Sequence, residues 1–307
     1  MSSNDRRRLI VTGATGKQGG AVIQALLAKP SQPFQIYAVT RNKESAPAKS
    51  LASKENVHVI QGDFDNPKGI LDQVPSPWGL FSVTTLQVGK SNAAGIEEQQ
   101  GKAMNAAAFG AGIKHLVYTS VDRGLDSDNT ETPIPHFRAK KHVEDDIKEK
   151  AAKNTGTTWT FIRPVAFMDN IGRDFFGKVF VTMWRQNGLD TPLQLVSTKD
   201  IGRVAAEAFL HADEEEYKNK SISLAGDSIT PRQAAKAFKE ATGLEMPSTY
   251  GVFGSLLKMI MKDEIGTMFE WFKSTGYAAD FKALRKSYPF LKDFKSWVET
   301  ESAWKKA

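Results

Sequence analysis

Short apolar runs alternate with longer helix-forming stretches over the first 165 residues of the chain. The apolar runs predict six buried strands, at residues 8–12, 34–40, 57–61, 78–84, 114–120 and 157–163. Helices are predicted between them, near residues 17–29, 44–53, 96–109 and 136–152. Repeated strand–helix units of this length predict an α/β fold, a doubly wound parallel sheet with helices on both faces.

The pattern changes after Pro164. A segment rich in Phe, Gly and Met runs to residue 184, and short strands are predicted at 193–196 and 221–225. Helices are predicted at 200–210, after the cap residue Thr230, and from about residue 251 onward. We expect one domain at residues 1–165, to which some later segments return, and a smaller, mostly helical C-terminal lobe at 166–307. The lobe is expected to pack over the ends of the parallel strands, where ligands of open α/β sheets bind.

Three glycines link the first strand to the first helix in VTGATGKQGGAVIQALL, residues 11–27. A tight turn between strand and helix is the setting that a dinucleotide-binding turn requires. Gly13 supplies backbone angles closed to other residues, Gly16 lets a pyrophosphate approach, and Gly19 lets the helix pack against the strand. The helix N-terminus offers N–H groups and a positive dipole end to the phosphates. The G-x-x-G-x-x-G spacing therefore predicts a Rossmann-type nucleotide site, with an ordinary glycine turn as the alternative.

The end of the second strand indicates which dinucleotide binds. Sheets that prefer NAD usually end this strand with an acidic residue, whereas here Thr40 is followed by Arg41, Asn42 and Lys43. Because a guanidinium grips a phosphate in a bidentate manner, we predict NADP(H) rather than NAD. The alternative is that Arg41 and Lys43 are exposed loop charges that pair with Glu44.

The ends of the third and fourth strands supply further candidates. Asp63 is expected to accept a hydrogen bond from the adenine amino group and Phe64 to lie along the adenine ring, unless Gly62-Asp63 is simply a turn. Thr84 and Thr85 are expected near the nicotinamide ribose.

Composition narrows the class of protein. The chain has 307 residues, 40% of them hydrophobic and 25% charged, as in a globular protein, and no apolar run is long enough to span a bilayer. Residues 1–8 lack the apolar core of a secretion signal.

The absence of cysteine excludes disulfides, Cys-ligated zinc and a Cys nucleophile, and it favours the cytoplasm, with the nucleus as a further location. The net charge of +6 is spread along the chain, with the densest cluster at Arg6-Arg7-Arg8, which is typical of a solvated surface rather than a nucleic-acid site. The five histidines have no metal-ligand spacing, so we expect no metal.

In their order along the chain, these motifs resemble the NmrA-like family of atypical short-chain dehydrogenases/reductases. The resemblance rests on GATGKQGG at 13–20, Thr40-Arg41-Asn42, Gln61-Gly62-Asp63, Gln100-Gly101-Lys102, His136-Phe137 with Lys140, Val143 and Glu144, Arg163-Pro164-Val165-Ala166-Phe167 with Asn170, and Gly276-Tyr277 through Trp297. It covers nearly the whole chain and implies a Rossmann domain that binds NADP(H) and a small lobe that closes a cleft. It does not imply one activity, because the family holds both reductases and cofactor-responsive regulators.

The residues and the resemblance together give one set of cofactor candidates. They are Gly13, Thr15, Gly16, Lys17, Gln18, Gly19, Arg41, Asn42, Lys43, Asp63, Phe64, Thr84, Thr85, Lys140, Pro164, Val165, Ala166 and Phe167.

The catalytic residues of the wider superfamily are matched only in part. Typical members place a tyrosine, which moves a proton at the substrate oxygen, four residues before a lysine that holds the ribose. Here Lys140 is the lysine, and His136 stands in place of the tyrosine on the same helix face. Three interpretations stay open: Lys140 acts as acid/base or anchor, His136 assists it, or Lys140 only grips the ribose and nothing is catalysed. His136 also suits a cap or packing role, and Ser120 either hydrogen-bonds a substrate carbonyl or ends its strand.

Two segments beside these residues lead to two candidate functions. The polar loop 121–135 is expected to border the nicotinamide, as a lid or as a merely mobile loop. The apolar segment 250–272 is expected to line a substrate pocket, or else to serve lobe packing or a subunit contact.

The first candidate function is an NADPH-dependent reductase of a small, largely apolar carbonyl, quinone or imine compound in a cleft between the lobes. The second is an inactive NADP(H) sensor that binds a regulatory protein partner according to cofactor state. Neither a nucleic acid nor a membrane is expected as partner.

Overall fold

The computed structural model describes residues 6–87 and 89–305, and the chain divides into two compact units. Unit 1 comprises the chain up to Ser120 together with Ala139–Arg163 and Ile201–Ile222. Unit 2 comprises Val121–Arg138, Pro164–Asp200 and the chain from Ser223 onward. The two units therefore alternate along the chain. The expectation about a secretion signal concerns residues 1–8, most of which lie outside the described residues.

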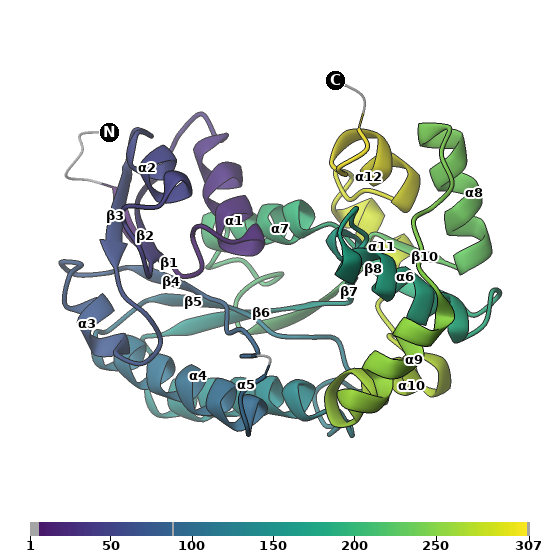
Figure 1. The fold of residues 1–307 in the computed structure, drawn as a ribbon. Coiled ribbons are helices and arrows are strands. Elements are labelled where there is room, and N and C mark those ends of the chain that lie inside the picture. Colours follow the sequence, from purple (N-terminus) through teal and green to yellow (C-terminus); the bar gives the residue numbers. More distant parts are fainter. Residues whose placement is uncertain (1–5, 88, 306–307) are drawn as a thin grey trace. The chain divides into compact units, whose positions relative to one another are not determined.

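Unit 1 is built on a seven-stranded sheet with the strand order β3-β2-β1-β4-β5-β6-β9 (Figure 1). Its strands are β1 (Arg7–Val11), β2 (Phe34–Thr40), β3 (Val57–Gln61), β4 (Gly79–Ser82), β5 (His115–Thr119), β6 (Thr158–Pro164) and β9 (Lys220–Leu224). Parallel pairings join β1 through β6, and Ile10 lies opposite both Tyr37 and Leu80. The strand order reverses between β1 and β4, so the crevice in which such sheets bind ligands lies at the carboxyl ends of these two strands.

Helices cover both faces of this sheet. They are α1 (Lys17–Leu27), α2 (Ala46–Ala52), α3 (Pro67–Leu71), α4 (Ala93–Gly110), α5 (Pro135–Lys153) and α7 (Thr198–Leu210). Helices α1 and α7 lie on one face, and α4 and α5 lie on the other (Figure 1). Helix α7 packs closely on α1, because a Cβ added to Gly202 would lie 2.5 Å from the Cβ of Ala21. The opposite face holds a core that includes Ile10, Leu80 and Val143, each fully buried.

Unit 2 contains a small sheet with the order β10-β8-β7, in which β8 pairs parallel to β7 and antiparallel to β10. Its elements are β7 (Ala166–Phe167), η2 (Met168–Asn170), α6 (Phe175–Gln186), β8 (Leu193–Val196), β10 (Asp227–Ile229), α8 (Pro231–Thr242), α9 (Gly251–Ile260), η3 (Lys262–Gly266), α10 (Thr267–Ser274), α11 (Phe281–Ser287) and α12 (Phe294–Thr300). Thr230 caps α8 in a reciprocal capping box with Gln233, as its sequence predicts.

The apolar segment 250–272 has two different environments in unit 2. Phe269, Trp271 and Phe272 of α10 are buried in the unit's hydrophobic core. In contrast, Val252 and Met259 of α9 are 66% and 69% exposed. Packing within the lobe therefore accounts for the second half of the segment, and the first half presents apolar side chains at the surface.

The predicted α/β fold is confirmed, and two helices were not predicted. Helix α6 was not predicted because apolar side chains lie on both sides of it: Val179 through Trp184 are buried, whereas Phe175 and Phe176 are exposed. Asp174, whose side chain accepts from the Gly177 N–H, was the available start signal. Helix α3 is only one turn long, and it is marked by the cap residue Asn66 followed by Pro67.

Candidate functional site

The glycine turn lies at the crevice between β1 and β4. Thr12 ties the two strand ends together, since its hydroxyl donates to the Phe81 carbonyl at 3.0 Å and accepts from the Val83 N–H at 3.0 Å. Gly13 then turns the chain with φ of +60°, a left-handed conformation that favours glycine. A Cβ at this position would also lie 2.9 Å from Val83 Cγ1. The role predicted for Gly13 therefore has a steric basis.

Gly19 holds helix α1 against this turn. A Cβ at Gly19 would lie 2.6 Å from the carbonyl carbon of Gly13, and nearer still to the carbonyl oxygens of Thr12 and Gly13. Gly16 is exposed and closes the turn by donating its N–H to Gly13 O at 2.9 Å. The glycines thus let a helix begin directly beside a strand end.

The N-terminus of α1 has the features of an anion site. No described side chain caps it at Gly16, and its first turn contains no acidic residue. Thr15 and Lys17 are exposed beside it, and Gln18 is partly buried with its side-chain oxygen lacking a hydrogen-bond partner among the described residues. Backbone N–H groups and the positive dipole end at this point favour a phosphate.

A cavity of about 250 Å³ lies at the ends of β2 and β3. Arg41, Gln61, Gly62 and Asp63 line it, together with three residues in and around α3, Asn66, Gly69 and Gln73. Arg41 and Lys43 form no ion pair with any described carboxylate, and Glu44 pairs instead with Lys49 at 3.0 Å. Arg41 and Lys43 are exposed, as the alternative expects, although Glu44 is not their partner, and the phosphate-binding role of Arg41 stays a prediction. Arg41 and Asp63 both line the cavity.

Two neighbours of this cavity have local structural roles. Asn42 accepts the Glu44 N–H on its side-chain oxygen at 2.9 Å, which shapes the loop after β2. Phe64 is partly buried and packs against the core of unit 1, and it is not one of the cavity-lining residues. The adenine-stacking role of Phe64 stays a prediction.

Lys140 is held in a buried polar cluster within unit 1. Its Nζ lies 2.8 Å from Glu97 Oε1 and donates to Thr84 Oγ1 at 3.0 Å. The Thr84 hydroxyl donates in turn to Glu97 Oε1 at 2.7 Å, and Tyr118 Oη lies 3.3 Å from Thr84 Oγ1. The Lys140 and Glu97 side chains are 14% and 1% exposed. The predicted neighbours Thr84 and Lys140 are thus brought together, whereas Thr85 is exposed.

The cluster fixes the charge state of Lys140. Burial alone would lower the pKa of Lys140, but the Glu97 carboxylate, with smaller contributions from Tyr118 and Glu144, outweighs burial and raises the pKa above its usual value. Burial raises the pKa of Tyr118 to about 12, although the Lys140 charge opposes this shift. At neutral pH Lys140 is therefore an ammonium ion and Tyr118 a neutral phenol.

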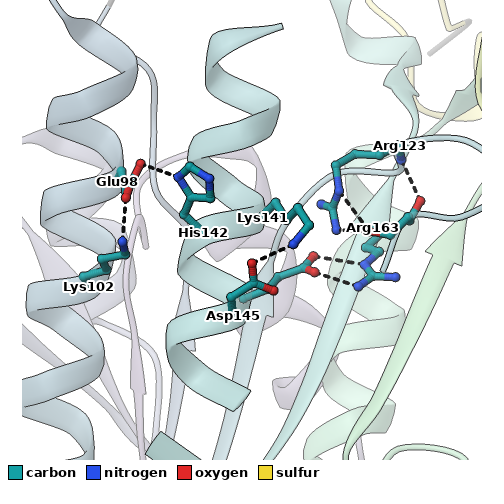
Figure 2. A network of polar contacts seen from close by, with 9 residues as sticks. Glu98, Lys102, Arg123, Lys141, His142, Asp145 and Arg163 are labelled. Carbon is teal, nitrogen blue, oxygen red and sulfur yellow. Dashed lines mark hydrogen bonds and ion pairs between the residues drawn. The ribbon is translucent and has the colours of Figure 1, made fainter. Parts of the chain in front are cut away.

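Helix α5, which carries Lys140, is fixed to α4 and to β6. A Cβ at Gly101 of α4 would lie 2.5 Å from Val143 Cγ2. Glu98 of α4 lies 2.7 Å from the His142 ring, as Figure 2 shows. The buried Arg163 of β6 makes two bonds to Glu144, at 3.0 and 2.6 Å. Several residues of the family resemblance thus serve to hold the Lys140 helix.

The other two catalytic candidates, His136 and Ser120, make contacts that suit a structural role. His136 lies in unit 2, where its Nδ1 is 2.5 Å from Glu264 Oε2 and its ring packs edge-on against Phe137. This arrangement favours the packing role for His136. Ser120 is 3% exposed and its backbone N–H donates to Ile162 O at 2.8 Å, which fits the end of a strand.

The loop 121–135 is not a surface loop throughout. Residues 121–124 are buried in unit 2, where Asp122 Oδ1 accepts the N–H groups of Gly124 and Ala278 at 3.0 and 3.1 Å. Leu125 is 99% exposed, so only the later part of the loop offers a free surface. Pro164, Val165 and Ala166 are likewise buried in unit 2 and Phe167 is partly buried, and their cofactor role stays a prediction.

Sequence reasoning missed Glu97 and Tyr118. A signal for Glu97 was available, because Glu97, Gly101, Met104 and Ala108 form the buried stripe of α4. A carboxylate on an apolar stripe requires a cation or hydrogen-bond donors.

Among the described residues, no group of three or more His, Cys, Asp or Glu side chains is arranged to hold a metal ion. No helix within residues 6–87 and 89–305 has the length and apolar character of a membrane span.

Comparison with known proteins identifies a family and several relatives of this chain. The model of the NmrA-like family matches residues 5–301. FrzB of Cladobotryum sp., an NmrA-like family domain-containing oxidoreductase, is 28% identical over 176 residues. That match covers 56% of this chain and 50% of FrzB, so the matched part spans about half the length of this relative.

Two solved structures share the fold over nearly all of the chain. The NADPH-dependent quinone oxidoreductase QOR2 of Escherichia coli, in complex with NADPH, superposes with a TM-score of 0.71 at 21% identity, covering 95% of this chain and 98% of QOR2. NmrA, a negative transcriptional regulator in complex with NADP, superposes with a TM-score of 0.68 at 18% identity, covering 97% of this chain and 95% of NmrA. At these identities the likeness shows the fold alone.

Proposed function

The chain belongs to the NmrA-like family, and from this premise we propose that it is an NADPH-dependent reductase of a small, largely apolar carbonyl, quinone or imine compound. The observation that carries the proposal is the cavity at the end of β2, where Arg41 and Asp63 face the same space. The oxidoreductase relative and the NADPH complex of a protein with the same fold support it.

The residues present fit NADP(H). Gly13 and Gly16 leave the turn open, and the uncapped start of α1 suits the pyrophosphate. Arg41, with Lys43 beside it, would bind the 2′-phosphate, and Asp63 would accept from the adenine. Lys140 and Thr84 would bind the nicotinamide ribose.

The chemistry divides between cofactor and protein. The bound cofactor supplies a hydride to an acceptor carbon. The protein binds and orients its phosphates through α1 and Arg41, and it holds a fixed positive charge at Lys140. Charge complementarity at Arg41 decides between the two dinucleotides.

Calorimetric titration with NADPH and NADH tests the cofactor assignment. Arg41→Ala is expected to weaken NADPH binding roughly 10- to 150-fold, because a charge-assisted hydrogen bond contributes about 1.5–3 kcal/mol, and to leave NADH binding unchanged. The matched control is Lys54→Ala, which removes the same charge from another exposed site of unit 1. A wild-type protein that binds NADH as tightly as NADPH would contradict the assignment. Failure to consume NADPH against a panel of carbonyls, quinones and imines would contradict the reductase activity.

The second candidate function is an NADP(H)-responsive regulator. His136, which replaces the superfamily tyrosine, is engaged with Glu264, so the usual proton donor is absent from that position. A regulator requires a partner whose affinity differs between the free and the NADP(H)-bound protein. Equal affinity in both states would exclude this function, and turnover of NADPH with a substrate would favour the reductase.

A further inference from the structure

The Lys140 cluster contains a residue to which the preceding assignment gives no role. Glu97 projects from the buried stripe of α4, and its side chain is 1% exposed. One carboxylate oxygen contacts both Lys140 Nζ, at 2.8 Å, and the Thr84 hydroxyl, at 2.7 Å. Burying a carboxylate is costly unless it is paired, so Lys140 and Thr84 compensate the burial of Glu97 through this one oxygen.

We propose that Glu97 is the positioning residue of this site, and that its buried carboxylate, together with Thr84, fixes the Lys140 ammonium as a permanent cation that binds the cofactor ribose and does not give a proton to the substrate. The inference rests on the proposed function, because it assigns Lys140 to NADP(H). It selects among the roles that the sequence left open for Lys140.

Geometry limits what the ammonium group does. Lys140 meets Glu97 from α4, Thr84 after β4, and the Tyr118 ring of β5 at 5.8 Å. Glu144, one turn further along α5, is bonded to Arg163 of β6. Loss of a proton from Lys140 would leave the Glu97 charge buried without its cation, which opposes transfer of that proton. A proton needed by a reduced carbonyl would therefore come from another donor.

Removal of the Glu97 charge reverses this balance. In Glu97→Gln, burial would act on Lys140 with only the weaker contributions of Tyr118 and Glu144 against it, so the lysine pKa would fall. Lys140 would then lose its proton at a lower pH than in the wild type. A purely structural role for Glu97 would not move this titration.

The experiment measures the reactivity of Lys140 toward acetic anhydride between pH 7 and pH 11, with peptide mass spectrometry as the readout. Only a neutral amine reacts, so the labelling curve follows deprotonation and needs no cofactor. Glu97→Gln is expected to shift the Lys140 curve by about 1–3 pH units toward lower pH, the usual effect of losing an adjacent opposite charge, while the curve of the exposed Lys54 stays in place. Glu97→Asp, which keeps the charge, is expected to retain most of the wild-type behaviour. Thr84→Val keeps the carboxylate and removes only the shared hydroxyl, so its curve is expected to lie between those of the wild type and Glu97→Gln.

Each outcome decides the proposal. Lys140 curves that coincide in the wild type and Glu97→Gln, including no labelling in either, would overturn it. Should Glu97→Gln not fold, the wild type decides: a Lys140 curve at lower pH than that of the exposed Lys54 would overturn the proposal, because the Glu97 pairing raises the pKa of Lys140. A companion titration with NADPH separates the two levels of inference. A shifted Lys140 curve without NADPH binding would retain the Glu97 pairing and remove the proposed function, whereas binding with unshifted curves would remove only the role of Glu97.

Discussion

Replacement of Gly19 by alanine tests the steric basis of the nucleotide turn. The new Cβ would lie 2.6 Å from the Gly13 carbonyl carbon, about 1 Å inside the ordinary contact distance of roughly 3.5 Å between carbon atoms. Both Thr12 and Gly13 meet it with backbone atoms, so no side-chain rotation relieves the clash. Overpacking of this kind costs about 1–3 kcal/mol. The helix must move away from the strand, and the turn must change shape.

Gly110→Ala is the matched control, because Gly110 is also helical and a Cβ there meets nothing within 4 Å. Both variants gain about 0.5–1 kcal/mol of helix propensity, so the difference between them isolates the clash. Urea unfolding followed by circular dichroism is expected to place Gly19→Ala about 1–3 kcal/mol below Gly110→Ala. Calorimetry is expected to show a loss of NADPH affinity in Gly19→Ala alone. Equal unfolding midpoints and unchanged NADPH binding in Gly19→Ala would refute the reasoning.

Two further predictions concern the frame around the site. Arg163→Met is expected to destabilise the protein by about 3–5 kcal/mol, since it removes both Arg163 bonds to the buried Glu144 carboxylate. Arg163→Met/Glu144→Leu is expected to recover most of this loss in urea unfolding. A double variant no more stable than the single one would argue against the ion pair as the cause. Burial lowers the pKa of His115 from 6.5 to about 3, so between these values the unfolded chain binds a proton that the folded protein does not. Stability is therefore expected to fall by up to about 1.4 kcal/mol per pH unit below pH 6.5 from this residue, and His115→Gln, measured by unfolding at pH 4–7, is expected to have a shallower slope. An unchanged slope would assign the acid sensitivity to other groups.

Local patterns were sufficient to predict the parts of the site that are continuous in sequence. Gly13, Gly16 and Gly19 lie within one strand–turn–helix unit, and their spacing between a predicted strand and a predicted helix is sufficient to predict the turn. The position of Arg41 at the end of β2 follows from the strand pattern, because the end of a parallel strand has a fixed position in a doubly wound sheet, and its phosphate-binding role stays a prediction.

Contacts between distant segments were beyond this kind of reasoning. The pairing of Glu97 with Lys140 depends on how α4 and α5 pack side by side, which no local pattern encodes. The same holds for His136, whose partner Glu264 comes from another part of unit 2. Helix α6 was not predicted because its exposed side also carries apolar residues, Phe175 and Phe176, which obscures the contrast with its buried side.

The alternation of the two units along the chain affects how the protein folds during synthesis. The last strand of the large sheet, β9, ends at Leu224, so the sheet keeps an open edge at β6 until more than two thirds of the 307 residues have left the ribosome. An unpaired strand edge is a template for pairing with other chains. A fragment cut near residue 165 would retain the glycine turn, Arg41 and Lys140, but its β6 edge would have no β9 to pair with. The later segments of the chain therefore protect the nascent sheet as well as completing it.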